Sequence, residues 1–84
     1  MIEIRFFAAL RERVGSDSLT VTPPDGVDTV AALVAWLADD NASVAGGLEA
    51  TPRYMVAVNE VLSQEQAAVR DGDVVALFPP VTGG

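Results

Sequence analysis

Hydrophobic and polar residues alternate in several short stretches of this 84-residue chain, which is the pattern of strands that bury one face. Separated by turn-forming residues, these stretches predict strands at 2–8, 18–22, 54–58, 61–62 and 74–78. The last stretch is the most apolar, which favours a central position in the sheet. The first two are close in sequence, so we expect them to pair antiparallel.

The alternation also predicts which side chains face away from the core. Phe7 falls on the polar face of the first stretch. In the last stretch the residues expected to face outward are Val74, Ala76 and Phe78. The residues expected to face inward are Ile2, Ile4, Phe6, Val75 and Leu77. If the first and last strands are neighbours, Phe7 and Phe78 share one exposed apolar patch; the alternative is that both rings cap the edge of the core.

Helical spacing is clearest between positions 30 and 37, which predicts an amphipathic helix of about three turns. Asp28 is the predicted N-cap, and the helix is expected to end near Asn41. A shorter helix is predicted at 9–14, closed by Gly15 in a left-handed conformation.

The segment 41–53 is predicted to be irregular, with at most a turn of helix around 44–48. Gly46 and Gly47 are interpreted as a turn signal. With one main helix crossing over a mixed sheet of about five strands, the predicted fold class is α+β. This is the β-grasp arrangement of ubiquitin. The predicted domain covers 1–78, followed by an extended tail at 79–84.

The composition removes most side-chain chemistry. Without cysteine or histidine, the chain has no thiolate nucleophile and no imidazole base or metal ligand, and no carboxylate pair stands at an evident spacing. We expect no bound metal and no bound cofactor. Without a cysteine thiol, any reactive sulfur would have to be attached to the chain by another protein.

Charge and hydropathy limit the partners and the location. The net charge of −7 disfavours nucleic acid and suits either solubility alone or a basic protein partner. No apolar run approaches membrane-spanning length, and 1–5 lacks the features of a signal peptide, so we expect no membrane contact and a cytoplasmic protein. The chain has no lysine, so it offers no side-chain amine to a second copy.

The chain ends in an unusual segment, Pro79, Pro80, Val81, Thr82, Gly83 and Gly84. Two prolines end the preceding strand and favour an extended path, so the six residues can reach about 20 Å from the domain. The two glycines would let the terminal carboxylate enter a narrow channel. From the tail alone, a functional carboxyl terminus and a frayed end remain open alternatives.

Five segments together resemble the small subunit of molybdopterin synthase, a family of ubiquitin-like sulfur carriers in molybdenum cofactor biosynthesis. These segments are 4–8, 11–15, 57–59, 71–73 and 78–84. The ending from Phe78 to Gly84 is the specific part, because a bare Gly-Gly end is shared with the carrier of thiazole synthesis and with other ubiquitin-like proteins. The chain departs from the family pattern only in its middle, and neither the segment 41–53 nor the lack of lysine is diagnostic of the family.

The resemblance implies a carrier mechanism. A ubiquitin-activating-type adenylyltransferase uses ATP to adenylate Gly84, and a sulfur donor protein then allows the thiocarboxylate to form. The tail, residues 79–83, threads into partner active sites. Sulfur passes to cyclic pyranopterin monophosphate within a heterotetramer of two small and two large synthase subunits. The small subunit itself is a carrier, and the complex is the sulfurtransferase.

The resemblance also implies a partner interface. Residues that match Phe7, Leu62 and Phe78 make hydrophobic contacts in the family, and a residue that matches Arg11 makes a polar contact. Three other functions stay open at this point: a sulfur carrier for thiazole or cysteine synthesis, a ubiquitin-like protein modifier, or an interaction module without terminal chemistry.

Overall fold

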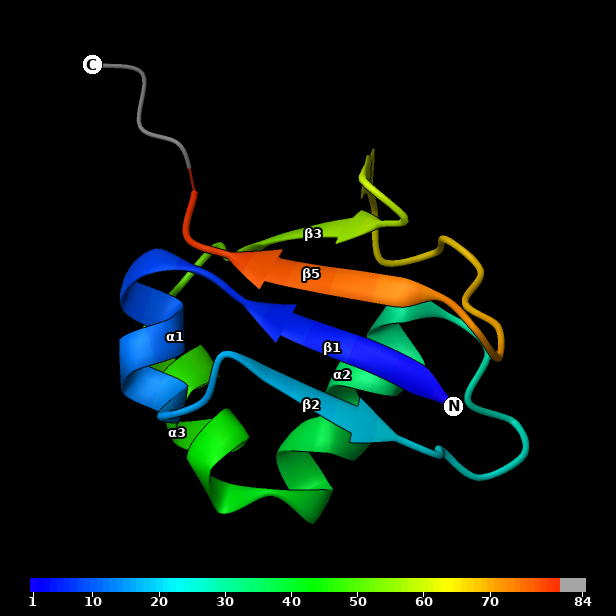
Figure 1. The fold of residues 1–84 in the computed structure, drawn as a ribbon, viewed down its shortest axis with the longest axis horizontal. Coiled ribbons are helices and arrows are strands. Elements are labelled where there is room, and N and C mark those ends of the chain that lie inside the picture. The colour runs from blue at the N-terminus through cyan, green and yellow to red at the C-terminus, as the bar shows by residue number, and fades with distance from the viewer. Residues whose placement is uncertain (81–84) are drawn as a thin grey trace.

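The computed structural model describes residues 1–80, which form one mixed sheet of five strands. The strands are β1 (Ile2–Phe6), β2 (Ser18–Val21), β3 (Met55–Val58), β4 (Val61–Ser63) and β5 (Val74–Phe78). Their order across the sheet is β2-β1-β5-β3-β4 (Figure 1). β5 is central, parallel to β1 and antiparallel to β3, while β1 and β2 are antiparallel. The predicted mixed sheet with a central last strand is confirmed.

Within residues 1–80 three helices accompany the sheet: α1 (Ala8–Val14), α2 (Val30–Asp40) and α3 (Ala42–Glu49). Figure 1 views the sheet from its uncovered face, with α2 behind the strands, α1 at one end, and α3 beside α1 and below β2 in this view. α3 packs against both α1 and α2. In this part of the chain no helix has the length and apolarity needed to cross a bilayer.

The helix α3 corrects the prediction of an irregular segment at 41–53. Its N-cap is Asn41, whose Oδ1 accepts from the backbone N–H groups of Ser43 (2.9 Å) and Val44 (3.2 Å). Gly46 and Gly47 lie inside this helix and do not form a turn. A Cβ on Gly47 would lie 2.5 Å from Val14 Cγ2, so the missing side chain lets α3 approach α1 closely. The predicted fold class is confirmed, with α2 as the longest helix, and α3 is a further helix that the sequence did not predict.

The cap of α2 is also corrected. The N-cap is Thr29, whose Oγ1 accepts from the backbone N–H of Ala32 at 3.2 Å. Asp28, the predicted cap, instead accepts at its backbone carbonyl from the N–H of Val69 at 3.0 Å. A threonine after an aspartate offers a second capping oxygen, and the sequence alone does not decide between them.

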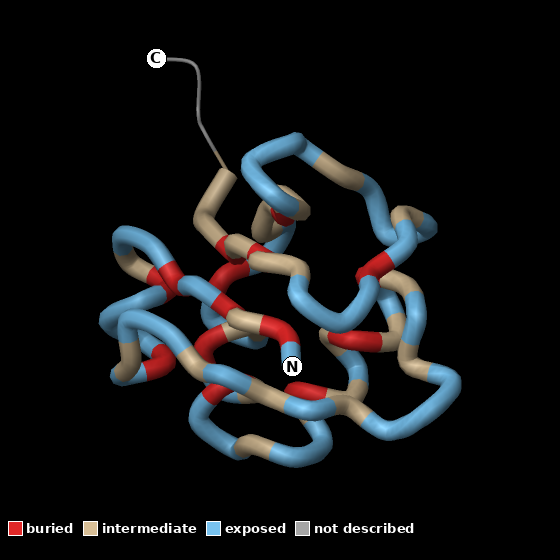
Figure 2. The backbone as a smooth tube through the Cα atoms, turned by 45° about the vertical axis from the view of Figure 1, so that its right-hand side comes forward, coloured by how far each residue is buried: buried red, intermediate tan, exposed pale blue. Residues whose placement is uncertain are grey.

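The core lies between the sheet and the helices. The residues predicted to face inward, Ile2, Ile4, Phe6, Val75 and Leu77, are all buried. Leu10, Leu33, Leu37 and Val44 meet them from the three helices. Figure 2 shows buried positions recurring along the strands and helices while exposed positions gather in the loops. The predicted inward set is confirmed.

Two turns fix the register of β5 at its start. Asn59 donates its backbone N–H to Val74 O (2.8 Å), and its Oδ1 accepts the N–H of Val74 (2.9 Å). Its Nδ2 also donates to Asp73 Oδ1 (3.0 Å). Gly72 has a φ of 92°, which glycine adopts without steric cost. These contacts tie the β3–β4 turn to the turn before β5 and thereby fix the residue at which β5 begins.

Candidate docking face and C-terminal tail

The uncovered face of the sheet carries a row of four side chains across its centre, an arginine followed by three small or apolar residues. Ala76 of β5 pairs with Arg5 of β1 on one side and with Ala57 of β3 on the other. Ala57 in turn pairs with Leu62 of β4. Paired residues in a sheet point to the same face, so these four side chains share the uncovered face.

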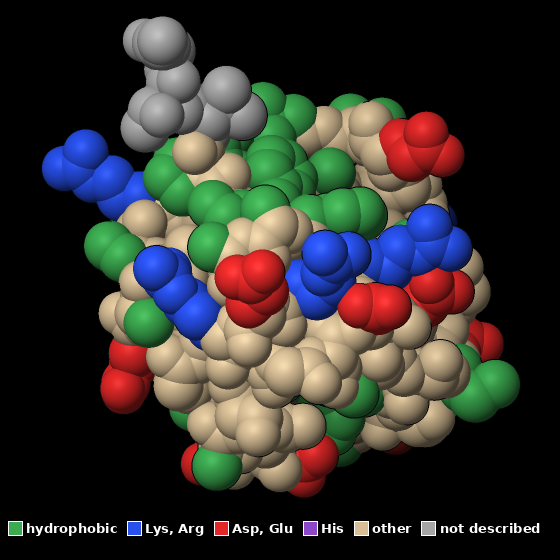
Figure 3. All heavy atoms as spheres, turned by 60° about the vertical axis from the view of Figure 1, so that its left-hand side comes forward, with side chains coloured by type: hydrophobic (Ala, Val, Ile, Leu, Met, Phe, Trp, Pro, Cys, Tyr) green, Lys and Arg blue, Asp and Glu red, His purple; other side chains and the backbone are tan. Residues whose placement is uncertain are grey.

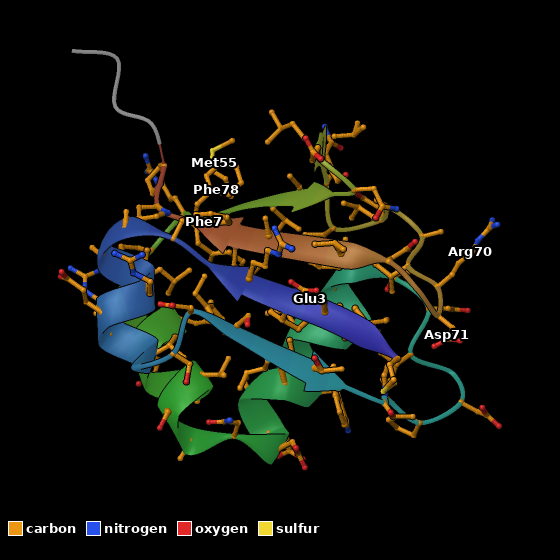
Figure 4. All side chains as sticks on the ribbon, in the orientation of Figure 1. Glu3, Phe7, Met55, Arg70, Asp71 and Phe78 are labelled. Atoms are coloured by element: carbon orange, nitrogen blue, oxygen red, sulfur yellow. The ribbon has the colours of Figure 1, made fainter. Side chains whose placement is uncertain are left out.

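A second row lies one step closer to the tail. Phe78 pairs with Met55 across β3 and β5, and the backbone N–H of Phe7 donates to Leu77 O at 3.2 Å, which sets Phe7 beside Phe78. In Figure 4 the labelled side chains of Phe7, Phe78 and Met55 lie near one another at the end of β5 from which the tail continues. The structure thus brings Phe7 and Phe78 together, as the alternation predicted.

We call the apolar side chains of these two rows the outer patch: Phe7, Met55, Ala57, Leu62, Ala76 and Phe78. Phe7 is 45% exposed and Leu62 62% exposed, whereas Phe78 and Met55 are half-buried. Figure 3 shows hydrophobic side chains gathered beside the end of the described chain, with charged side chains at the border. An exposed apolar cluster of this kind is typical of a protein-binding surface.

The backbone holds Phe7 in its outward position. Besides the bond from its N–H, its carbonyl accepts from the N–H of Arg11 at 3.3 Å, which starts α1. The next residue, Ala8, has a φ of 54°, an uncommon conformation for a residue other than glycine. This abrupt change turns the chain from β1 into α1 and leaves the Phe7 ring outside the core.

Arg5 and Arg11 both lie near Phe7. Both arginines line one shallow hollow with Phe7, at the junction of β1 and α1. Arg5 Nε is paired with the carboxylate of Glu3, and Arg11 Nε lies 3.7 Å from Asp17 Oδ1, with all four side chains at the surface. Exposed pairs of this kind contribute little to stability, so both guanidinium groups remain available to a partner.

Sequence reasoning missed Met55, Ala57 and Ala76 as members of the outer patch. The alternation of β5 marked Ala76 as outward but gave it no role. The signal for the other two is the pairing of β3 with β5, which places Met55 opposite Phe78 and Ala57 opposite Ala76. That pairing depends on sheet order, which alternation within a single strand does not reveal.

Of the tail, the structure describes only its first two residues. Pro79 and Pro80 are half-buried directly after Phe78. Val81, Thr82, Gly83 and Gly84 lie outside the described residues, so their predicted roles stay predictions.

One titratable group in residues 1–80 has a clearly shifted pKa. Burial raises the pKa of the Tyr54 phenol above its ordinary value of 10.0, and the nearby carboxylate of Glu65 raises it further. Tyr54 therefore stays neutral at physiological pH and is not a base. In the same residues, no group of three or more histidine, cysteine, aspartate or glutamate side chains is placed to hold a metal ion.

The strand order and the uncovered apolar face define a ubiquitin-like β-grasp domain that presents the outer patch beside its C-terminal segment. The sequence matches the model of the ThiS family over residues 4–84, and the chain belongs to this family. The match includes the final six residues as well as the folded domain.

Three relatives match over nearly the whole of both chains. The molybdopterin synthase sulfur carrier subunit of Escherichia coli is 42% identical over 84 residues, and that of Haemophilus influenzae is 38% identical over 84 residues. In both cases the match covers 100% of each chain. Small archaeal modifier protein 3 of Haloferax volcanii is 37% identical over 91 residues, covering 99% of this chain and 98% of that protein.

Solved structures agree on the fold. Small archaeal modifier protein 1 of Haloferax volcanii aligns with a TM-score of 0.74 and 30% identity, over 95% of this chain and 97% of that one. A subunit in the complex of subunits 1 and 2 of the molybdopterin-converting factor of Helicobacter pylori aligns with a TM-score of 0.66 and 26% identity. That alignment covers 99% of this chain and 97% of the other. The predicted β-grasp fold and the predicted family resemblance are confirmed.

Proposed function

We propose that this protein is the sulfur carrier of molybdenum cofactor biosynthesis. The observation that carries the proposal is the full-length similarity to two molybdopterin synthase sulfur carrier subunits. In this chain the outer patch adjoins Pro79 and Pro80, with which the sequence Pro-Pro-Val-Thr-Gly-Gly begins. The chemistry then belongs to the carboxylate of Gly84, and the folded domain serves to present that carboxylate to other proteins.

The proposed cycle begins with activation. A carboxylate at cellular pH is a poor electrophile, so a ubiquitin-activating-type adenylyltransferase joins an oxygen of the Gly84 carboxylate to the α-phosphate of ATP, and pyrophosphate leaves. Sulfur supplied by a donor protein then replaces AMP at the acyl carbon, which gives a thiocarboxylate. ATP is used by the activating enzyme, and this chain needs no cofactor of its own.

In the second stage the charged carrier docks on the large synthase subunit. The complex of the two subunits from Helicobacter pylori supports a partner of this kind. Phe7, Phe78 and Leu62 would be buried in the interface, with Arg11 as a polar contact, while residues 79–83 lead Gly84 to the large subunit's active site. Sulfur is transferred there to cyclic pyranopterin monophosphate, and the carrier leaves as the carboxylate.

Removal of Gly84 tests the proposal. The truncated protein should keep the thermal midpoint of the full chain and still bind the large subunit, because the domain and the outer patch are unchanged. It should nevertheless form no molybdopterin in a mixture of activating enzyme, ATP, sulfur donor, large subunit and precursor. Molybdopterin formation by the truncated protein would contradict the proposal.

A second function is favoured by one observation, the 37% identity to small archaeal modifier protein 3. In this alternative the activated Gly84 is transferred to an amine of a target protein, or its sulfur serves another pathway such as thiazole or cysteine synthesis. Capture of the partner distinguishes them: a large synthase subunit retained by the wild-type chain supports the first proposal, and covalent adducts on lysines of other proteins support the modifier.

A further inference from the structure

Arg53 occupies an unusual place at the border of the outer patch. It lies two residues before Met55, the register partner of Phe78, and it is exposed. It therefore stands beside the same end of β5 from which the tail continues, although it comes from the segment between α3 and β3. Sequence reasoning assigned it no role.

The segment that carries Arg53 is firmly anchored. Thr51 is buried, and its Oγ1 donates to Gly47 O at 2.9 Å. Arg13 Nη1 donates to Thr51 Oγ1 (2.8 Å) and to Ala50 O (2.6 Å). The turn is thus joined to both α1 and α3, so the position of Arg53 relative to the outer patch is set by the fold.

The backbone at Arg53 does not favour an arginine. Its φ is 61°, in the left-handed region that suits glycine and disfavours longer side chains. Such residues persist where the surrounding structure imposes them, and they gather at binding sites. A glycine at this position would remove the conformational cost, so the arginine side chain calls for another explanation.

No contact inside the described chain supplies that explanation. The ion pairs that arginines make in residues 1–80 involve Arg5 and Arg11, and the guanidinium of Arg13 is used to join two helices. Arg53 has no carboxylate within ion-pair distance there. Within residues 1–80 it is therefore a positive charge without an ion-pair partner, beside Met55 of the outer patch, in a chain of net charge −7.

Arg70 provides the natural comparison. It is also exposed and makes no side-chain ion pair in the described residues, but it precedes the turn that leads into β5. In Figure 4 Arg70 and Asp71 lie at the opposite end of β5 from Phe7, Phe78 and Met55. Replacement of either arginine changes the net charge equally, and only one of them borders the outer patch.

We propose that Arg53 is a docking residue that receives a carboxylate of the protein seated on the outer patch. The occupant is a partner protein whose surface combines an apolar hollow with an acidic side chain at its border. Charge complementarity and continuity with the outer patch support this partner chemistry. The inference rests on the proposed function, in which that partner is the large synthase subunit.

The test measures association of the cognate large subunit with the wild-type chain, Arg53→Glu and Arg70→Glu at several salt concentrations. Arg53→Glu should lower the association rate about tenfold at low salt and less at high salt, because charges at the rim of an interface act mainly on encounter. Arg70→Glu, the matched control, should change it less than about twofold.

Arg53→Gly separates docking from stability. Relief of the left-handed strain should raise its thermal midpoint above that of the wild-type chain, while loss of the guanidinium should weaken binding several-fold. A higher thermal midpoint together with a lower affinity supports the docking role, because damage to the fold would lower both the midpoint and the affinity.

Three results would overturn the inference. Equal effects of Arg53→Glu and Arg70→Glu would show that only net charge matters. Tighter binding by Arg53→Glu would mean a basic border on the partner. If the wild-type chain itself failed to bind the large subunit, the proposed function would fail as well, whereas the first two results leave it standing.

Discussion

The two faces of β5 carry similarly apolar side chains, but the helices cover only one of them. Val75 and Leu77 point toward the helices and are 0% exposed, whereas Val74, Ala76 and Phe78 point to the uncovered face and are half-buried. A sheet that packs on one side normally places polar residues on the other. The inner residues are therefore explained by the stability of this domain, whereas the apolar outer residues have no such role and fit the interface that we propose.

The largest effect is expected on the inner face. Leu77→Ala should lower the free energy of unfolding by about 2–5 kcal/mol, because a buried leucine is lost and a cavity remains. Phe78→Ala should cost about 1 kcal/mol or less, since its ring is already partly in water. Urea unfolding followed by circular dichroism measures both. Similar losses for the two variants would break the distinction between the faces.

For binding to the large subunit we expect the opposite order, with the larger effect on the uncovered face. Phe78→Ala should weaken association with the large subunit by about tenfold or more, since burial of an aromatic ring contributes about 1.5–3 kcal/mol. Thr20→Ala, on the uncovered face of β2 and away from the outer patch, is the control and should bind like the wild-type chain. Calorimetric titration gives both affinities, and an unchanged affinity for Phe78→Ala would count against the outer patch as an interface.

The two adjacent glycines of α3 also differ in their surroundings, because only Gly47 lies against another helix. Gly47→Val should destabilise the domain by about 1–3 kcal/mol, because its side chain would collide with Val14. At Gly46 an added Cβ meets nothing within 4 Å, so Gly46→Ala should stabilise the helix by about 0.5–1 kcal/mol. Thermal unfolding of both variants measures the difference, and opposite signs are expected.

The smallest effect concerns the titration of Tyr54, which is the only tyrosine of the chain. Its pKa is raised in the folded state by burial and by Glu65, so its neutral form is favoured. The resulting stability is fully present below the ordinary pKa of 10.0 and is lost as pH rises through the folded value. The ultraviolet absorbance of tyrosinate should therefore appear at lower pH in the unfolded chain than in the folded one. Coincident titrations would contradict the raised pKa.

Alternation of hydrophobic and polar residues was enough to predict the five strands, their inward faces and the exposure of Phe7, although the first strand ends at Phe6 and not at residue 8, where α1 begins. It succeeded because the side-chain period of a strand is local and the core lies on one side of the sheet. It was also enough to place Phe78 on the outer face. The Pro-Pro-Val-Thr-Gly-Gly ending could also be identified from the sequence alone, because its residues are contiguous.

The features that sequence reasoning missed depend on contacts between distant segments. The two glycines of α3 indicate a turn locally, but Gly47 is required by the close approach of Val14. Met55 belongs to the outer patch only because β3 lies beside β5. Arg53 becomes notable only when its backbone conformation and its lack of an ion pair within residues 1–80 are known.

The most direct test of the proposed function detects the sulfur of the thiocarboxylate on the protein. Because the chain lacks cysteine, a thiocarboxylate would be its only thiol-type nucleophile, and iodoacetamide would label it selectively. Alkylation also avoids a mass ambiguity, since replacement of oxygen by sulfur and oxidation of Met1 or Met55 both add about 16 Da. After incubation with activating enzyme, ATP and sulfur donor, we predict one carbamidomethyl group on the peptide that ends in Gly84. A protein that stays unlabelled, or a label on any other peptide, would contradict the claim that the reactivity of this chain belongs to its terminal carboxylate.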